Sequence, residues 1–215
     1  MKNTVINSIL ENKIVVIVRG VAKEKLIPLA EAMYAGGIRL LEITYSADKS
    51  VSDEETAANI AMLAKHFEGR MFIGAGTVLN ESQVELTKNA GGKFIISPDV
   101  NEAVIKKSVE LGLVSMPGAL TPSEITAADR AGADFVKLFP ITNLGIDYVK
   151  AVRAPLSHIK MIAVGGVHEG NMKDYLRAGV CGFGIGSNIV DKKLIEAEDY
   201  AEITELAKRF IEAIK

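Results

Sequence analysis

The segment 35–44, AGGIRLLEIT, ends an amphipathic stretch in a small-residue turn and passes at once into an apolar strand. Glycine just past a helix end supplies the left-handed conformation that closes the helix. The same order of helix, turn and strand recurs along the chain, with turns at 90–92, 111–112, 131–133 and 178–179. The strands expected after these five turns are 38–44, 93–97, 113–116, 134–138 and 180–185. Three further apolar runs complete eight strands: 14–18, 71–74 and 159–164.

Amphipathic stretches lie between these strands. Apolar residues recur at helical spacing over 23–35, 53–66, 82–90 and 101–111. Helix N-caps are expected at Ser82, Asn101, Thr121 and Asn171, and Thr121-Pro122-Ser123-Glu124 has the pattern of a capping box.

Strict alternation of strands and helices indicates parallel pairing with right-handed crossovers. Eight such units within 215 residues favour a compact (β/α)8 barrel, a TIM barrel, with an extra helix over residues 2–11. We see no linker, so residues 1–215 are predicted to form a single domain. The alternative is an open doubly wound sheet. It is disfavoured because no G-x-G-x-x-G turn follows the first strand.

Composition excludes several classes of protein. The 25 basic and 27 acidic residues are interspersed, so no nucleic-acid surface is expected. The single cysteine, Cys181, rules out an intramolecular disulfide and fits a reducing compartment. The longest aliphatic run near the N-terminus, 14–18, is too short for a membrane span or a signal peptide. We therefore expect a soluble cytoplasmic protein.

One lysine stands in an apolar run, FVKLFP at 135–140. A strand there would place Phe135, Lys137 and Phe139 on one face. Burial disfavours the charged form of an amine and lowers its pKa, and a neutral amine can attack a ketone to form a Schiff base. The alternatives for Lys137 are a structural lysine at a strand end and a buried ion pair.

Glu42 is a second ionisable group in an apolar strand, on the face shared by Leu40 and Thr44. It would either pair with Lys137 or Arg19 to satisfy buried charge, or shuttle protons beside an amine nucleophile. Both Lys137 and Glu42 fall at the carboxyl ends of expected barrel strands, where the chemistry of such barrels gathers. Together they favour catalysis.

Glycines follow the last two expected strands, at Gly165-Gly166 and Gly186-Ser187. Barrels commonly bind phosphate at this position through backbone N–H groups. The alternative is that the glycines only permit tight turns. Arg19, at the end of the first strand, would either clamp a carboxylate or phosphate or form a core salt bridge. No metal site is predicted, because His66, His158 and His168 lack ligand spacing.

Several ordered segments resemble one family, the class I aldolases that act on 2-keto-3-deoxy-6-phosphogluconate and 4-hydroxy-2-oxoglutarate. The segments are LEIT at 41–44, GAGTV at 74–78, ISP at 96–98, MPG at 116–118, FVKLFP at 135–140 and GGV at 165–167. The resemblance implies a barrel, a homotrimer, no metal or other cofactor, and pyruvate as one product. It assigns Lys137 as the Schiff-base lysine and Glu42 as the acid/base. It places Arg19 and Thr77 at the pyruvate carboxylate, Pro98 and Phe139 in the pocket lining, and Gly165, Gly166, Gly186 and Ser187 at the substrate phosphate.

Two segments depart from the family pattern. Some members carry an arginine soon after the glutamate motif, where this chain has Tyr45-Ser46-Ala47, and members often have Pro-Thr where Ala163-Val164 stands. Both departures concern the aldehyde partner of the reaction. The favoured function is cleavage of a 2-keto-4-hydroxy acid to pyruvate and an aldehyde. Two other functions remain open at this point: a phosphate-binding isomerase or synthase, and a non-catalytic sugar-phosphate-binding barrel.

Overall fold

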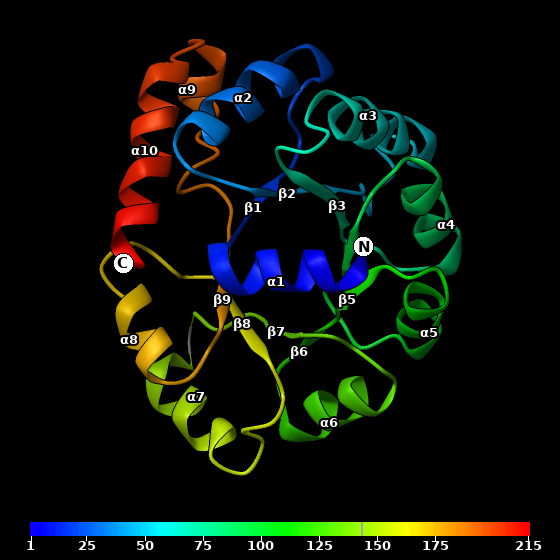
Figure 1. Ribbon diagram of the computed structural model, residues 1–215, viewed down its shortest axis with the longest axis vertical. Helices are drawn as coiled ribbons and strands as arrows, with labels where there is room; N and C mark the ends of the chain where they lie inside the picture. The colour runs from blue at the N-terminus through cyan, green and yellow to red at the C-terminus, as the bar shows by residue number, and fades with distance from the viewer. Residues whose placement is uncertain (143) are drawn as a thin grey trace.

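The parallel strands form a ring with helices around it (Figure 1). The computed structural model describes residues 1–142 and 144–215. In hydrogen-bonded order the strands are β5-β4-β3-β2-β1-β9-β8-β7-β6. Their bounds are β1 Ile14–Val18, β2 Leu40–Thr44, β3 Phe72–Gly76, β4 Phe94–Ile96, β5 Val114–Met116, β6 Gly118–Ala119, β7 Val136–Leu138, β8 Met161–Val164 and β9 Gly182–Ile185.

β5 corresponds to the strand expected over 113–116, and β6 continues it beyond Pro117, which has no backbone N–H to donate. β7 nevertheless contacts both halves. The N–H of Phe135 donates to the carbonyl of Ser115 at 3.2 Å, and the N–H of Lys137 donates to the carbonyl of Pro117 at 2.9 Å. The ring is therefore nearly closed. The predicted (β/α)8 barrel is confirmed, and the open doubly wound alternative is wrong.

Helices cover the outside of the ring, and α1 lies across its centre in Figure 1. The expected helices over 23–35 and 53–66 have these same bounds, and the extra N-terminal helix is confirmed, one residue longer than expected. The bounds are α1 Lys2–Asn12, α2 Lys23–Ala35, α3 Asp53–His66, α4 Glu81–Asn89, α5 Glu102–Glu110, α6 Pro122–Arg130, α7 Gly145–Arg153, α8 Met172–Arg177, α9 Lys192–Glu196 and α10 Tyr200–Ala213.

Two expected N-caps are corrected. The capping box at Thr121 and the cap at Asn101 are confirmed. Helix α4 begins earlier than predicted, because the side chain of Asn80, not Ser82, accepts from the N–H of Gln83 at 3.0 Å. Asn171 precedes α8 but makes no capping bond, since its Oδ1 accepts from the N–H of His168 on its N-terminal side.

Apolar residues pack in two layers, one between strands and outer helices and one inside the ring. The inner cluster includes Val15, Leu40, Phe94 and Phe135, which come from four strands and the residues next to them. α1 contributes Val5 and Ile9 to it, so this helix closes the end of the barrel where the strands begin. Burial of these side chains is the main force that holds α1 across the opening. The polar residues of the opposite end are left free for a site.

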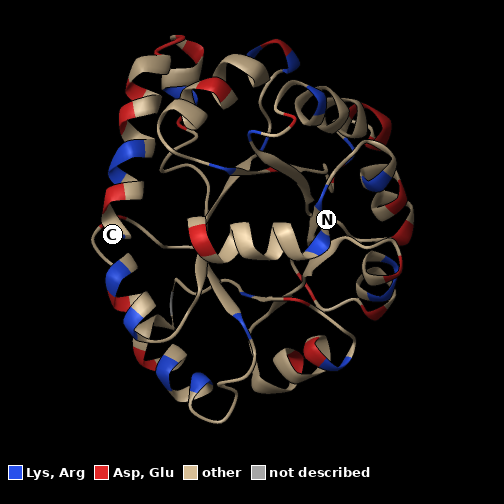
Figure 2. Cartoon of the chain, viewed as in Figure 1, with Lys and Arg blue, Asp and Glu red and all other residues tan. Residues whose placement is uncertain are grey.

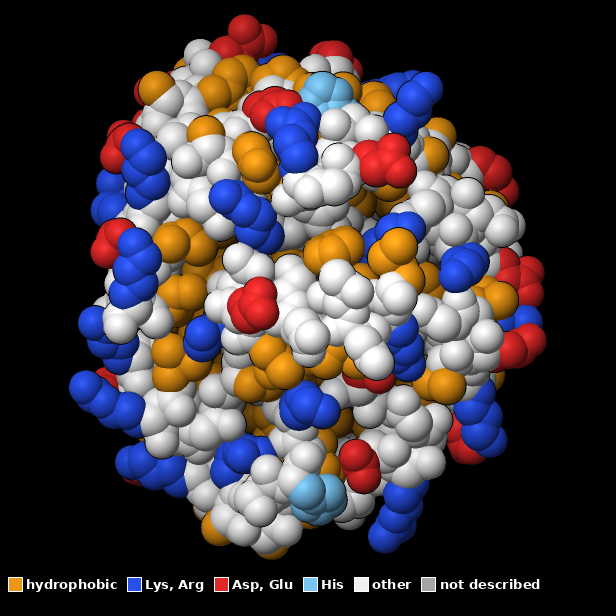
Figure 3. All heavy atoms as spheres, viewed as in Figure 1, with side chains coloured by type: hydrophobic (Ala, Val, Ile, Leu, Met, Phe, Trp, Pro, Cys, Tyr) orange, Lys and Arg blue, Asp and Glu red, His pale blue; other side chains and the backbone are white. Residues whose placement is uncertain are grey.

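Most charged residues lie on the outer helices, and most of the strand ribbon carries none (Figure 2). Side chains of both signs are scattered over the face that carries α1 (Figure 3). None of the described helices is both long and apolar enough to cross a membrane.

Candidate active site

The strand period places Lys137 inside the barrel. Phe135 belongs to the inner cluster, whereas Val136 and Leu138 pack outward against the helices. Lys137 is 7% exposed, and its Nζ lies 4.4 Å from the centre of the Phe139 ring. The alternative of a structural lysine at a strand end, with its amine reaching solvent, does not fit this burial.

Glu42 also points into the barrel, from the facing side of the ring. Leu41 and Ile43 pack in the outer layer, so Glu42 faces inward with Leu40. Glu42 is 2% exposed, and its Oε2 has no hydrogen-bond partner among the described residues. Its carboxyl group occupies the space beside Gly76, where a Cβ atom would overlap Oε1. The glycine is therefore required for the position of the carboxylate.

The two ionisable groups shift in opposite directions for one main reason. Burial raises the pKa of Glu42 and lowers the pKa of Lys137, because each loses the water that stabilises its charged form. Each group's charge opposes the other's shift, and the charge of Arg19 lowers both pKa values. No ion pair joins Glu42 to Lys137 or to Arg19 in the described part of the chain. The alternative of an ion pair that only satisfies buried charge does not fit this arrangement, and burial shifts the pKa of each group in the direction of its neutral form.

Arg19 and Thr77 meet at the open end of the barrel. Nη2 of Arg19 donates to Oγ1 of Thr77 at 2.9 Å, across 58 residues of sequence. Thr77 has a φ of 54°, a left-handed conformation that a β-branched residue rarely adopts. Such strain persists only where the surroundings hold it.

Three side chains hold the segment that follows Thr77. Ser97 donates to the carbonyl of Val78 at 2.8 Å, and Asn101 donates to the carbonyl of Leu79 at 3.2 Å. Oε1 of Gln83 accepts from the N–H of Leu79 at 2.8 Å. These contacts fix the backbone that presents the Thr77 hydroxyl to Arg19.

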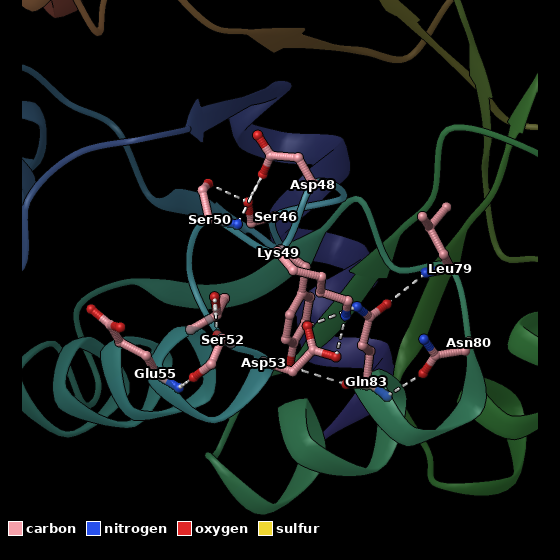
Figure 4. A network of polar contacts seen from close by, with 12 residues as sticks. Ser46, Asp48, Lys49, Ser50, Ser52, Asp53, Glu55, Leu79, Asn80 and Gln83 are labelled. Atoms are coloured by element: carbon pink, nitrogen blue, oxygen red, sulfur yellow. Dashed lines mark hydrogen bonds and ion pairs between the residues drawn. The ribbon is translucent and has the colours of Figure 1, made fainter.

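Gln83 extends this support to the loop after β2 (Figure 4). Its Nε2 donates to Oδ1 of Asp53 at 3.1 Å, and Asp53 pairs with Lys49 at 2.8 Å. The backbone carbonyl of Gln83 accepts a hydrogen bond from the hydroxyl of Tyr45 at 3.2 Å. Sequence reasoning missed Gln83 because one amide in a helix gives no local signal of its role.

The glycines after β8 and β9 lie at the same end of the barrel. Gly165 and Gly166 have φ values of 92° and 70°, which explains the need for glycine at both positions. Asn171 donates to the carbonyl of Gly166 at 3.0 Å, and Asn188 donates to the carbonyl of Val167 at 2.9 Å. Gly166 and Ser187 are exposed residues, and among the described residues no acceptor is bonded to their N–H groups. These loops can therefore offer several donors to an anion.

The remaining predicted lining residues flank Lys137. Gly118 pairs in register with Lys137, and a Cβ at Gly118 would overlap the carbonyl of Pro98. Pro98 therefore lies one strand beyond Lys137, and Phe139 lies under its amine. The described residues contain no cluster of three or more His, Cys, Asp or Glu side chains able to hold a metal ion.

A buried lysine, a buried carboxyl and an arginine at the strand ends fit the family of aldolases that the sequence motifs resemble. The family model for KDPG and KHG aldolase matches residues 5–206. The chain belongs to the KDPG and KHG aldolase family. Its members are class I aldolases, which are aldehyde-lyases. The resemblance seen in the sequence motifs is confirmed.

Named relatives include enzymes with different sugar acids in their names. A probable 2-dehydro-3-deoxy-6-phosphogalactonate aldolase of Rhizobium meliloti is 37% identical over 84% of this chain and 82% of its own length. The KHG/KDPG aldolase of Escherichia coli is 36% identical over 89% of this chain and 87% of its own length.

One solved structure with the same fold contains a covalent intermediate. The KDPG aldolase of Legionella pneumophila, with pyruvate captured as a covalent carbinolamine, has a TM-score of 0.84 and 28% identity, with 97% of both chains covered. This likeness supports the barrel assignment.

Proposed function

We propose that this KDPG/KHG-family aldolase cleaves a 2-keto-4-hydroxy acid to pyruvate and an aldehyde, with Lys137 as the Schiff-base nucleophile and Glu42 as the acid/base. The observation that carries the proposal is the burial of both groups at one end of the barrel, 7% and 2% exposed. Burial favours the neutral amine that attacks a ketone and the protonated carboxyl that starts acid catalysis.

The first half of the reaction forms the imine. The amine of Lys137 attacks C2 of the substrate and gives a carbinolamine. Glu42 donates its proton to the C2 hydroxyl, which leaves as water, and a protonated imine and a carboxylate remain.

The second half breaks and resets the bonds. The Glu42 carboxylate takes the proton of the C4 hydroxyl, the C3–C4 bond breaks, and its electrons enter the imine to give an enamine and a free aldehyde. Glu42 then returns the proton to C3, and water adds to the imine as Glu42 takes a proton from it. Collapse of the carbinolamine releases pyruvate and the neutral amine of Lys137, and Glu42 is again protonated.

Two further groups would hold the substrate. Arg19 and Thr77, joined at 2.9 Å, present a cation and a hydroxyl for the carboxylate of the keto acid. The N–H groups of the exposed residues Gly166 and Ser187, with the hydroxyl of Ser187, would take a phosphate at the far end. We therefore propose 2-keto-3-deoxy-6-phosphogluconate or its galactonate epimer as the substrate, with glyceraldehyde 3-phosphate as the aldehyde, over 4-hydroxy-2-oxoglutarate, which would yield glyoxylate.

Borohydride trapping tests the mechanism. Reduction in the presence of pyruvate should add one reduced pyruvate to the chain, and peptide mass analysis should place it on Lys137. Lys137→Ala should show no adduct and no turnover. An unmodified wild-type protein under conditions that modify a known Schiff-base aldolase would disprove the proposal.

A substrate panel tests the specificity. Coupled pyruvate release should give a higher kcat/KM for the phosphorylated sugar acids than for 4-hydroxy-2-oxoglutarate. A preference for the unphosphorylated acid would contradict the phosphate assignment.

Assembly and location are proposed on the family resemblance. A homotrimer is expected, and sedimentation equilibrium measures it directly. A cytoplasmic location agrees with one cysteine, Cys181, whose thiol pKa is raised by burial to about 11 and which is therefore unreactive.

A further inference from the structure

Three neighbouring strands of the ring end beside the proposed phosphate site. β7, which carries Lys137, pairs with β8, and β8 pairs with β9 (Figure 1). The loops after β8 and β9 contribute Gly166 and Ser187 to that site. The loop after β7 adjoins the loop after β8, so a side chain on it can reach the same ligand.

Hydrogen bonds hold the loop after β7 in place. The N–H of Phe139 donates to the carbonyl of Ala119 at 3.1 Å, and the N–H of Ile141 donates to the carbonyl of Val164 at 3.1 Å. Val164 is the last residue of β8, and the Ile141 side chain is fully buried. These contacts fix the backbone just before Thr142 against the start of the glycine loop.

The side chain of Thr142 packs against both glycines of that loop. A Cβ atom at Gly166 would lie 2.9 Å from Oγ1 of Thr142, and a Cβ atom at Gly165 would lie 3.2 Å from it. The first distance is shorter than real Cβ contacts, so glycine at position 166 leaves the space that the Thr142 hydroxyl occupies. Thr142 is nevertheless exposed, and its hydroxyl donates no hydrogen bond within the described part of the chain. The hydroxyl can therefore donate to a ligand at this loop.

The loops around the phosphate site offer few other side-chain donors. Neither 165–171 nor 186–191 contains a lysine or an arginine, and Val164, directly before the glycines, has no polar side-chain atom. A phosphate monoester carries a charge of about −1.5 to −2 and has three strong acceptor oxygens. Hydrogen bonds to such an ion are stronger than bonds between neutral groups. One further hydroxyl should therefore contribute measurably to binding.

We propose that Thr142 is a specificity-determining residue, whose hydroxyl donates a hydrogen bond to the substrate phosphate beside the N–H of Gly166. This inference rests on the proposed function, because it adds a contact to the same phosphate site. The strand that carries Lys137 runs directly into the loop that carries Thr142. One segment of chain would thus hold the keto group at one end of the substrate and the phosphate at the other.

Glycerol 3-phosphate is the probe for this contact, because it carries a phosphate and has no keto group to react with Lys137. Isothermal titration of the full-length protein should show that it binds at least about 10-fold tighter than glycerol. Thr142→Val keeps the shape of the side chain and removes the hydroxyl, and it should weaken glycerol 3-phosphate binding by about 10-fold. Thr142→Ser keeps the hydroxyl, and its affinity should stay within about 3-fold of wild type.

Turnover gives a second measurement. Thr142→Val should raise KM for a phosphorylated sugar acid by about 10-fold and leave KM for 4-hydroxy-2-oxoglutarate unchanged. Borohydride should trap pyruvate on Lys137 in both Thr142 variants as in wild type.

Thr126→Val is the matched control, because the Thr126 hydroxyl donates to the carbonyl of Pro122 within α6. It should match wild type in affinity and in both KM values. Circular dichroism should show that all three variants are folded.

Four results would overturn the inference. The first is equal affinity of wild type and Thr142→Val for glycerol 3-phosphate, and the second is an equal loss in the Val and Ser variants, which would assign the effect to packing. The third is an equal rise in KM for phosphorylated and unphosphorylated substrates. The fourth is equal affinity of wild type for glycerol and glycerol 3-phosphate.

Failure of the proposed function gives a different result. It would appear as an absent pyruvate adduct on wild-type Lys137, whereas the effect of Thr142 on glycerol 3-phosphate binding does not depend on the lysine.

Discussion

The carboxyl group of Glu42 lies where a side chain at Gly76 would stand. A Cβ atom at position 76 would overlap Oε1 of Glu42. Gly76 pairs in register with Thr44, two residues beyond Glu42 on the neighbouring strand. The carboxyl group of the proposed acid/base, Glu42, can therefore occupy this position only because residue 76, on the neighbouring strand, has no Cβ atom.

Gly76→Ala should displace the Glu42 carboxyl and lower kcat by about 100-fold or more, the size of a lost acid/base contribution. Borohydride should still trap pyruvate on Lys137, because the amine is not displaced. Gly170→Ala is the matched control, since a Cβ there would meet only the exposed His168 ring at 3.3 Å. Steady-state kinetics on both variants give the test, and a fully active Gly76→Ala enzyme would contradict the role of Glu42.

The charge of Arg19 should set the pH range of activity. Its charge lowers the pKa of both Lys137 and Glu42. Activity falls at low pH as the amine gains a proton and at high pH as the carboxyl loses one, so the kcat/KM profile should be bell-shaped. Arg19→Met raises both pKa values and should move the whole profile to higher pH.

Arg19→Lys is the control for this shift, because it keeps the charge and loses the planar fork. It should raise KM and leave the pH profile near its original position. A profile that does not move in Arg19→Met would show that Arg19 is electrostatically remote from the lysine.

We expect the buried Lys137 side chain to lower the free energy of unfolding of the protein at neutral pH. Its folded-state pKa lies below the ordinary value of 10.5, so the folded protein binds this proton less tightly than the unfolded chain. The destabilisation is present at neutral pH and disappears as the pH rises past 10.5. Lys137→Met should therefore raise the free energy of unfolding at neutral pH by about 1–4 kcal/mol, and the gain should shrink as the pH rises.

Urea unfolding across this pH range measures the effect. Lys106→Met is the control, because the Lys106 side chain is 66% exposed in an ion pair with Glu102. It should change stability by less than about 0.5 kcal/mol. A destabilised Lys137→Met protein would indicate that the lysine has a structural role.

Gln83 should act on substrate binding through the Thr77 segment. Gln83→Leu removes the acceptor for the N–H of Leu79 and the donor to Asp53, 2.8 and 3.1 Å away. We expect about 1–3 kcal/mol of lost stability and a higher KM for the keto acid. Asn80→Ala, which removes the cap of α4, should cost about 1 kcal/mol and leave KM unchanged. Equal KM values in the two variants would indicate that Gln83 contributes to stability and not to substrate binding.

Ser187 should distinguish phosphorylated from unphosphorylated substrates. Ser187 is exposed in the turn after β9. Loss of one hydroxyl on a charged phosphate costs about 1.5–3 kcal/mol, so Ser187→Ala should raise KM for a phosphorylated sugar acid by about 10-fold or more. KM for 4-hydroxy-2-oxoglutarate should not change. An equal rise for both substrates would place Ser187 elsewhere in the site.

Much of this molecule follows from local patterns. The alternation of apolar strands and amphipathic helices predicted the barrel, and the two-residue period of 135–139 predicted which way Lys137 points. Caps were predicted less well, because Asn80 and Ser82 have similar propensities and only the path of the preceding loop selects between them.

The sequence by itself determined the ring of strands, the inward direction of Glu42 and Lys137, and the family, because periodicity and motifs are properties of short segments. The tertiary structure alone decided that Arg19 reaches Thr77 and that Gly76 makes room for Glu42. Those relationships join residues on different strands and helices. Strand register and helix packing set their distances, and no local pattern encodes either.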